Sequence, residues 1–169
     1  MGKIKIDLEN SGLIQKLTKM RAKAEMDKIK QFIEQWKEDE PGIKRAFTAI
    51  VDRIVRMDNI SIEFNARPGI TYSLRPRHNA QKKRSLFAMV DVIDDDPEAR
   101  WLSICFYGEM ISDPEDMGDL IPGGLLGEDG YCFDLDEYDD NKVDYIKKRL
   151  DEAYESAKSE PTAMNTISH

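Results

Sequence analysis

The sequence predicts an α+β domain with a mostly antiparallel sheet of about five strands, helices on one face of that sheet and an N-terminal helical extension. Two observations lead to this fold class. Apolar residues recur every three or four positions over residues 43–57 and 143–157, which is the spacing of the buried side of a helix. Between these stretches apolar and polar residues alternate, which is typical of strands that cover a core with one face.

Residues 1–40 are predicted to form an extension outside the main domain. Residues 3–8 alternate between polar and apolar, as a short edge strand does, and residues 10–12, Asn-Ser-Gly, are typical of a turn. A helix is expected over residues 13–36. Its apolar residues form two offset stripes, so the helix either breaks near Ala24 or contacts two different surfaces. We expect this extension either to dock on a protein partner or a second copy, or to be a fraying terminus.

Residues 41–158 are predicted to form the α+β domain. Its first helix follows Pro41, whose fixed φ suits a first helical turn. Residues 60–65 and 70–75 then alternate between apolar and polar side chains. Between them, residues 67–69, Arg-Pro-Gly, place proline and glycine where a type II turn requires them. This pattern predicts a β-hairpin.

Two further strands are expected at residues 86–93 and 101–107, joined by an acidic turn. The next segment, residues 108–130, contains more than half of the chain's ten glycines and is expected to be irregular but packed. A fifth strand is expected over residues 131–137. The sheet should therefore be antiparallel.

The last helix is predicted to open at Asp139 and Asp140, whose carboxylates suit the positive end of a helix. Its apolar stripe should lie on the sheet. The following residues, 159–169, are polar and are expected to form a disordered tail.

The overall composition bounds the partners and the compartment. A net charge of -8 disfavours non-specific binding of the whole molecule to nucleic acid or anionic lipid, although a local basic patch can still act at close range. No apolar run approaches the length of a membrane helix, and the start of the chain lacks a signal-peptide pattern. The sequence therefore predicts a cytoplasmic protein with no membrane partner.

Cys105 and Cys132 are the two cysteines of the chain, and each lies in a strand-like apolar run. We expect them to be small buried hydrophobic residues. A disulfide between neighbouring strands is the less favoured alternative, because the expected compartment is reducing.

Charged residues are segregated along the chain. No acidic residue lies between Arg67 and Arg84, whereas residues 85–140 contain seventeen carboxylates and a single cation, Arg100. Such blocks either face each other or form surface patches of opposite sign. Arginine can fork two hydrogen bonds onto a phosphate, and tyrosine can stack on a base. The predicted ligand-binding residues are Arg67, Tyr72, Arg75, Arg77, Lys82, Lys83 and Arg84. The alternative is that these cations are solvated or pair with the acidic segment.

The acidic segment offers only weak metal candidates, although clustered carboxylates can bind magnesium or calcium. These candidates are Asp91, Asp94, Asp134 and Asp136. The stretch from Asp134 fails the EF-hand pattern, because Asp139 stands where glycine is required. Solvated turns and helix capping are the favoured interpretation, so no cofactor is expected.

Residues for nucleophilic catalysis are scarce. His78 is the only histidine before the terminal His169, and no serine or cysteine spacing indicates a triad. The spaced glycines at 124, 127 and 130 lack the Lys-Ser/Thr of a phosphate loop. The sequence therefore leans away from an enzyme.

Four sequence stretches carry a family resemblance: FTAIVDRIVRM before the hairpin, ITYSLR in its second strand, ISDPEDMGDLIPGGLLGEDGYCFDL, and VDYIKKRLDEAYESA at the end. Through them, residues 47–157 resemble a family of small bacterial domains of unknown function that often accompany nuclease-like domains. They are more distantly similar to YjbR-like α+β domains, whose frataxin-like sheet has been discussed as a DNA-binding surface. The resemblance implies the fold described above and, by analogy, an association with nucleic acid.

The residues and the resemblance together favour a non-enzymatic binding module. Its partner, a protein or a nucleic acid, would be contacted through residues 67–84. The alternative is a metal-dependent enzyme acting on a phosphate-containing substrate, with carboxylates holding the metal and arginines holding the phosphate.

Overall fold

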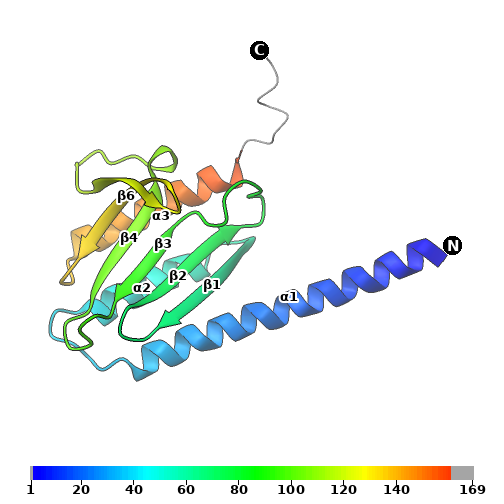
Figure 1. Cartoon of the computed structure of the whole chain (residues 1–169), viewed down its shortest axis with the longest axis horizontal. Helices are drawn as coiled ribbons and strands as arrows, with labels where there is room; N and C mark the ends of the chain where they lie inside the picture. Colours follow the sequence, from blue (N-terminus) through cyan, green and yellow to red (C-terminus); the bar gives the residue numbers. More distant parts are fainter. Residues whose placement is uncertain (1, 161–169) are drawn as a thin grey trace, which may run out of the picture.

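The computed structural model describes the backbone of residues 2–160 and the side chains of residues 12–160. The expected tail lies almost entirely outside these described residues. Over this range the chain forms an α+β fold (Figure 1). Its elements are α1 Gly2–Gln35, α2 Ile43–Val55, β1 Ile60–Arg67, β2 Thr71–His78, β3 Met89–Ile93, β4 Trp101–Tyr107, the short 3-10 helix η1 Gly108–Met110, β5 Asp119–Leu125, β6 Glu128–Leu135 and α3 Asp140–Lys158.

The strands form one antiparallel sheet in the order β1-β2-β3-β4-β6-β5. Directly opposed residues of an antiparallel pair share a face of the sheet. One row of opposed residues is buried from one strand to the next, and it consists of Phe64, Leu74, Val90, Ile104 and Phe133. The helices α2 and α3 cover this face and lie behind the sheet in Figure 1. The fold class predicted from the sequence is therefore confirmed, and the opposite face, called the open face below, carries no helix in the described part of the chain.

The sheet has six strands rather than the expected five, because part of the glycine-rich segment forms β5. This strand pairs with β6 from Asp119 to Leu125, with a register shift between Ile121 and Leu125. Pro122 and two glycines interrupt the alternation that would have revealed it. An edge strand tolerates such residues, because one of its sides needs no hydrogen bonds to a neighbour.

The predicted N-terminal strand at residues 3–8 is wrong. The backbone is helical from Gly2 to Gln35 without a break, so the expected turn at residues 10–12 and the break near Ala24 are also absent. An alternating run of six residues also satisfies helical spacing, since positions 4 and 8 are about one turn apart. Of the two predicted stripes, only the second contacts a surface, through Ile29 and Trp36; the first, from Leu13 to Ala24, is exposed, so its contact with a different surface stays a prediction.

The second half of α1 covers the edge of the sheet formed by β1. Ile29, Phe32 and Trp36 are buried in the core. The Glu25 carboxylate accepts a hydrogen bond of 2.7 Å from the backbone N–H of Phe64 in β1. Burial of Glu25 opposes its ionisation, but hydrogen bonds from Lys28 and Phe64 outweigh this effect and lower the pKa of the carboxyl. A covered edge strand is protected from pairing with another chain.

The hairpin between β1 and β2 closes as predicted. The Ile70 N–H donates to the Arg67 carbonyl at 2.9 Å, and Gly69 has a φ of 83°, which is the left-handed conformation that a type II turn requires. The start of α3 is also confirmed, because the Asp139 side chain accepts a hydrogen bond from the Lys142 N–H.

Arg100, the only cation among residues 85–140, ties α1 to two turns of the sheet. Its Nε donates to Asp94 at 2.7 Å, and Asp94 also accepts from the Gly69 N–H at 2.8 Å. The guanidinium lies about 5 Å from the ring centres of Trp36 and Phe32. Since the Asp94 side chain is only 3% exposed, this is a buried ion pair.

A disulfide joins Cys105 and Cys132, which face each other in the register of β4 and β6 with their Cα atoms 4.1 Å apart. This corrects the expectation that both cysteines are free. The sequence alone could not decide the point, because the pairing depends on which strands are neighbours. Over the residues described, no helix combines the length and the apolar character needed to cross a membrane.

Candidate functional site

Strand alternation places three of the predicted ligand-binding arginines on the open face. Arg75 and Arg77 lie two residues apart in β2, and Arg67 in β1 lies opposite Thr71 in β2. Residues that are two apart in a strand point to the same side. Arg67, Arg75 and Arg77 are called the cation line below. Because Thr71 and Arg77 are six residues apart, the cation line extends over about 20 Å of the hairpin.

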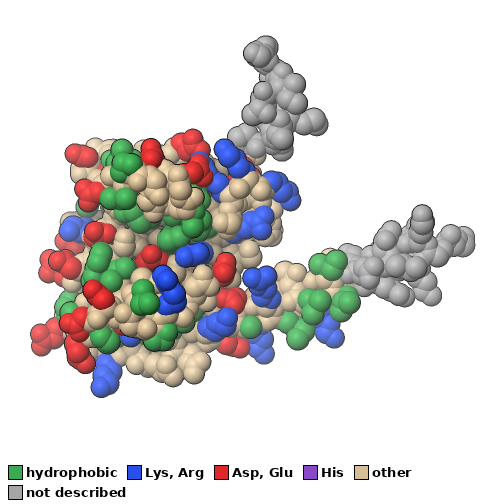
Figure 2. All heavy atoms as spheres, viewed as in Figure 1, with side chains coloured by type: hydrophobic (Ala, Val, Ile, Leu, Met, Phe, Trp, Pro, Cys, Tyr) green, Lys and Arg blue, Asp and Glu red, His purple; other side chains and the backbone are tan. Residues whose placement is uncertain are grey.

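A shallow hollow of about 670 Å³ lies beside the cation line, where α1 meets the hairpin. It is lined by Lys28, Phe64, Asn65, Ala66, Arg67, Ser73 and Arg75. Three of these side chains are cationic, and Asn65 carries an amide group that can hydrogen-bond an anion. The Ser73 hydroxyl is buried and accepts a hydrogen bond from Arg75. In Figure 2, basic side chains gather over the β1–β2 half of this face and beside the base of α1, whereas acidic side chains are concentrated along the opposite margin.

The guanidinium groups of Arg67 and Arg75 are held by neutral partners. Arg67 Nη2 donates to Thr71 Oγ1 and Arg75 Nε donates to Ser73 Oγ, both at 3.1 Å. Neither arginine forms an ion pair with a carboxylate among the residues whose side chains are described. Glu63 lies opposite Arg75 in the register, without such an ion pair. Since a guanidinium has five N–H donors, both groups retain donors for a ligand.

The third member of the cation line is held more firmly. Arg77 Nη2 donates to the Gln81 carbonyl at 2.6 Å, while the side chain as a whole is exposed. Its charge is therefore presented at the end of the hairpin farthest from Arg67, next to the loop after β2.

Asp91 lies on the same face, one strand away from Arg75. It is opposed by Ser73 in β2 and by Ser103 in β4. Burial raises the pKa of the Asp91 carboxyl, against the opposite effects of Ser73, Arg75 and Arg67. One carboxylate oxygen, Oδ1, is buried without a hydrogen-bond partner in the described part of the chain. An ionised Asp91 weakens the positive potential at the hollow, and protonation removes this effect.

The loop that contains the other predicted cations is used within the fold. The backbone N–H groups of Lys82, Lys83 and Arg84 donate to the Glu160 carboxylate. Burial of Glu160 is outweighed by these hydrogen bonds, which lower its pKa. The side chains of Lys82 and Lys83 are exposed at one end of the sheet.

The guanidinium of Arg84 is bound by partners within the fold. Its guanidinium pairs with Glu109 and Glu128 and lies 4.1 Å from the ring centre of Tyr107. The hydrogen bond that Arg84 donates to the Glu128 carboxylate is the main cause that raises the pKa of Arg84. Arg84 thus agrees with the alternative predicted from the sequence, in which cations of the basic segment pair with carboxylates of the acidic segment. It is therefore not part of the candidate site.

Tyr72 is separated from the cation line by the sheet itself. It lies on the helix-covered face, because it is opposed by Ala66 and by the buried Val92. Its ring stacks on Phe32 with the ring centres 4.1 Å apart. The structure therefore does not bring Tyr72 to the arginines with which the sequence grouped it.

The carboxylates considered as metal ligands lie apart. Asp94 binds Arg100 at the end of β3, Asp134 is exposed on β6, and Asp136 follows that strand. Asp91 and Asp134 are both opposed by Ser103, so one whole strand separates them. Among the side chains described, no group of three or more His, Cys, Asp or Glu residues is arranged to hold a metal ion.

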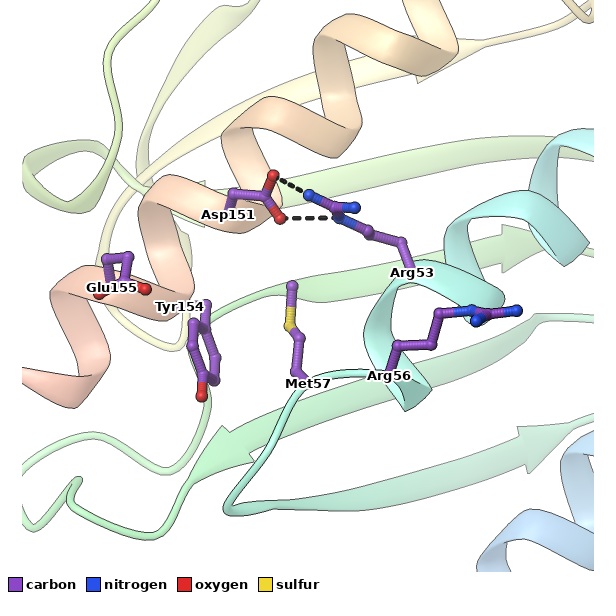
Figure 3. Close-up of a pocket in the computed structure, with 6 residues that line it drawn as sticks. All are labelled: Arg53, Arg56, Met57, Asp151, Tyr154 and Glu155. Carbon is purple, nitrogen blue, oxygen red and sulfur yellow. Dashed lines mark hydrogen bonds and ion pairs between the residues drawn. The ribbon is translucent and has the colours of Figure 1, made fainter.

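A second hollow, of about 380 Å³, lies between α2 and α3 (Figure 3). The guanidinium of Arg53 forms two hydrogen bonds with the carboxylate of Asp151 across this hollow. Tyr154 donates to the Asp58 carbonyl at 2.9 Å. Since its central charges satisfy each other, this hollow has less capacity for a charged ligand than the one on the open face.

Sequence reasoning missed three polar residues of the open-face hollow, Lys28, Asn65 and Ser73. Asn65 and Ser73 were assigned to the polar side of the hairpin, and the shared side of Arg67, Arg75 and these two residues follows from strand alternation once the register is known. Lys28 gave no signal, because its place depends on how α1 docks on β1.

No protein-family model matches the chain, and neither the curated proteins nor the solved structures include a significant match. The family resemblance described from the sequence therefore stays a prediction. The function has to be inferred from the geometry of the site.

Proposed function

We propose that this protein is a non-enzymatic binding module that holds a single-stranded nucleic acid by its phosphates along the cation line. The observation that supports this proposal is the linear arrangement of Arg67, Arg75 and Arg77 on one face of the hairpin. A single small anion cannot reach groups spread over about 20 Å, whereas a chain of repeated phosphates can. The hollow beside Lys28 gives the strand a place to lie.

The chemistry of the hollow suits phosphate better than a neutral ligand. Guanidinium groups form charge-assisted, often bidentate, hydrogen bonds with phosphate oxygens. Asn65 adds a neutral amide donor between Arg67 and Arg75. With Tyr72 on the other face, binding through phosphates would depend little on base sequence.

The test is the binding of a fluorescently labelled single-stranded oligonucleotide, followed by anisotropy over a range of salt concentrations. We expect the double variant Arg67→Gln with Arg75→Gln to bind roughly a hundredfold more weakly, from about 1.5 kcal/mol per charge-assisted hydrogen bond. The slope of log K against log salt should fall by about 2, one for each lost phosphate contact.

The matched control is Lys82→Gln with Lys83→Gln, which removes the same charge from exposed side chains outside the cation line. It should keep most of the affinity. Equal losses in both double variants would mean that only net charge matters, and an unmodified chain that binds no oligonucleotide at low salt would remove the proposal. Preference for a duplex would overturn the single-stranded form of it.

A protein partner and a cytoplasmic location belong to the same proposal. The exposed part of α1 offers an apolar surface for a protein.

The Cys105–Cys132 disulfide is the observation that opposes a cytoplasmic location, because disulfides persist mainly in oxidising compartments. In a cytoplasmic protein, alkylation at the moment of lysis should label both cysteines, as measured by mass. A pair that resists alkylation until it is reduced would contradict that location.

A further inference from the structure

The first half of α1 is a helix without a partner in the described structure. The part of α1 that precedes Glu25, residues 2–24, is called the arm below. Every arm residue from 12 to 24 is exposed, and Figure 1 shows the arm projecting away from the sheet and the other helices. Four large apolar side chains of the arm are between 54% and 62% exposed: Leu13, Ile14, Leu17 and Met20. Figure 2 shows hydrophobic side chains gathered along it. A lone helix gains little stability in water, and an apolar stripe on it is a signature of association.

The spacing of the stripe is that of a coiled coil. Leu13, Leu17, Met20 and Ala24 are separated by four, three and four residues, which corresponds to alternating d and a positions of a heptad. The same spacing reaches position 10, an asparagine, and position 6, an isoleucine. A polar residue at one a position lowers stability and helps to specify the register.

We propose that the arm pairs with the arm of a second copy of this chain as an antiparallel coiled coil. The charge pattern at the flanking e and g positions is complementary only in this orientation. When Leu13 of one copy is set against Leu17 of the other, positions 7 and 9 of each copy flank positions 21 and 23 of the other. Positions 7 and 9 are acidic, and positions 21 and 23 are Arg and Lys. Each dimer thus contains four opposite-charge pairs of this kind.

A parallel pairing has the opposite electrostatics. There, position 16 of each copy flanks position 21 of the other, and these are Lys16 and Arg21, so two like-charge contacts form and the acidic positions gain no cation. The antiparallel pairing has one like-charge contact, between Lys16 of both copies. It also places the two sheets at opposite ends of the coil, where they do not compete for space.

The first test is the mass of the full chain in sedimentation equilibrium. We expect about twice 19.4 kDa. The variant Leu13→Glu with Leu17→Glu should be a folded monomer, because both side chains are exposed, and its thermal midpoint should not depend on protein concentration. The matched control, Gln15→Glu with Ala22→Glu, makes the same charge change at two outward f positions and should remain a dimer.

The second test determines the orientation. Arg21→Glu should raise the dimer dissociation constant about tenfold, because positions 7 and 21 then repel, and adding Asp7→Lys should restore it. In a parallel dimer Arg21→Glu would instead tighten association by removing the contact with Lys16. That outcome would overturn the proposed arrangement.

The other occupants of the arm are outcomes of the same experiment. A full chain that sediments as a monomer at every concentration would overturn the proposal. So would a monomer whose arm binds anionic phosphatidylserine vesicles or the labelled oligonucleotide, with binding lost in Leu13→Glu with Leu17→Glu. The variants of Arg67 and Arg75 leave the arm intact and should remain dimers, so failure of the dimer and failure of nucleic-acid binding are distinguishable.

Discussion

At the scale of single residues, the surroundings of each arginine decide what it can do. Arg84 and Arg100 each hold carboxylates and lie over aromatic rings, so their charge serves the fold. Arg67 and Arg75 are held by hydroxyl groups and, among the residues whose side chains are described, keep unused donors. The sequence could not separate these two groups, because the acidic partners of Arg84 are 25 and 44 residues away in the chain.

Asp91 provides a test at this scale. Burial raises the pKa of Asp91 in the folded protein above its unfolded value of about 3.9. The free energy of unfolding should therefore fall as pH rises from the unfolded pKa through the folded pKa, because Asp91 ionises while it is buried. We expect Asp91→Asn to be more stable than the original chain at pH 7 and equally stable below about pH 4. Urea unfolding at both pH values measures this difference.

The control for Asp91 is Asp134→Asn, an exposed carboxylate on the same face that is separated from it by one strand. It should change stability little at either pH. Asp91→Asn should also tighten oligonucleotide binding at pH 7, because it removes a negative charge beside Arg75. If Asp91→Asn had a lower free energy of unfolding than the original chain at pH 7 and an equal one at pH 4, this would contradict a raised pKa for Asp91.

At the scale of elements, much of the fold was predictable, because α2, α3 and the first hairpin have strong periodicity and clear turn residues. Two elements were not. Residues 3–8 satisfy strand and helix spacing equally, and β5 is interrupted by proline and glycine yet forms because β6 supplies its hydrogen bonds. The sequence predicted that the candidate site is basic, but not which residues belong to it. Tyr72 and Asn65 lie on opposite faces of the sheet, so Tyr72 is outside the site and Asn65 is part of it.

The Arg100–Asp94 pair tests how the elements are held together. Asp94→Asn leaves a buried guanidinium without its counter-charge, and breaking such a pair costs about 3 kcal/mol. The neighbouring Asp95→Asn is exposed and should stay within about 0.5 kcal/mol of the original chain. Both values come from chemical denaturation. Similar effects of the two substitutions would show that the pair does not anchor α1 to the turns.

At the scale of the whole molecule, the chain separates two surfaces. The open face carries the cation line beside a margin rich in carboxylates, and the arm carries an apolar stripe well away from it (Figure 2). In the proposed dimer the paired arms overlap over residues 6–24, about 27 Å of helix, and hold two open faces apart. Two separated binding faces would raise the avidity for a long strand without any new contact.

The most direct test of nucleic-acid binding is an NMR titration of the 15N-labelled chain with a short single-stranded oligonucleotide. We expect the backbone amides around Asn65, Arg67, Ser73 and Arg75 to shift, while those of residues 82–84 and of the arm stay in place. Shifts confined to the arm or to residues 82–84, or no shift at low salt, would contradict binding on the open face.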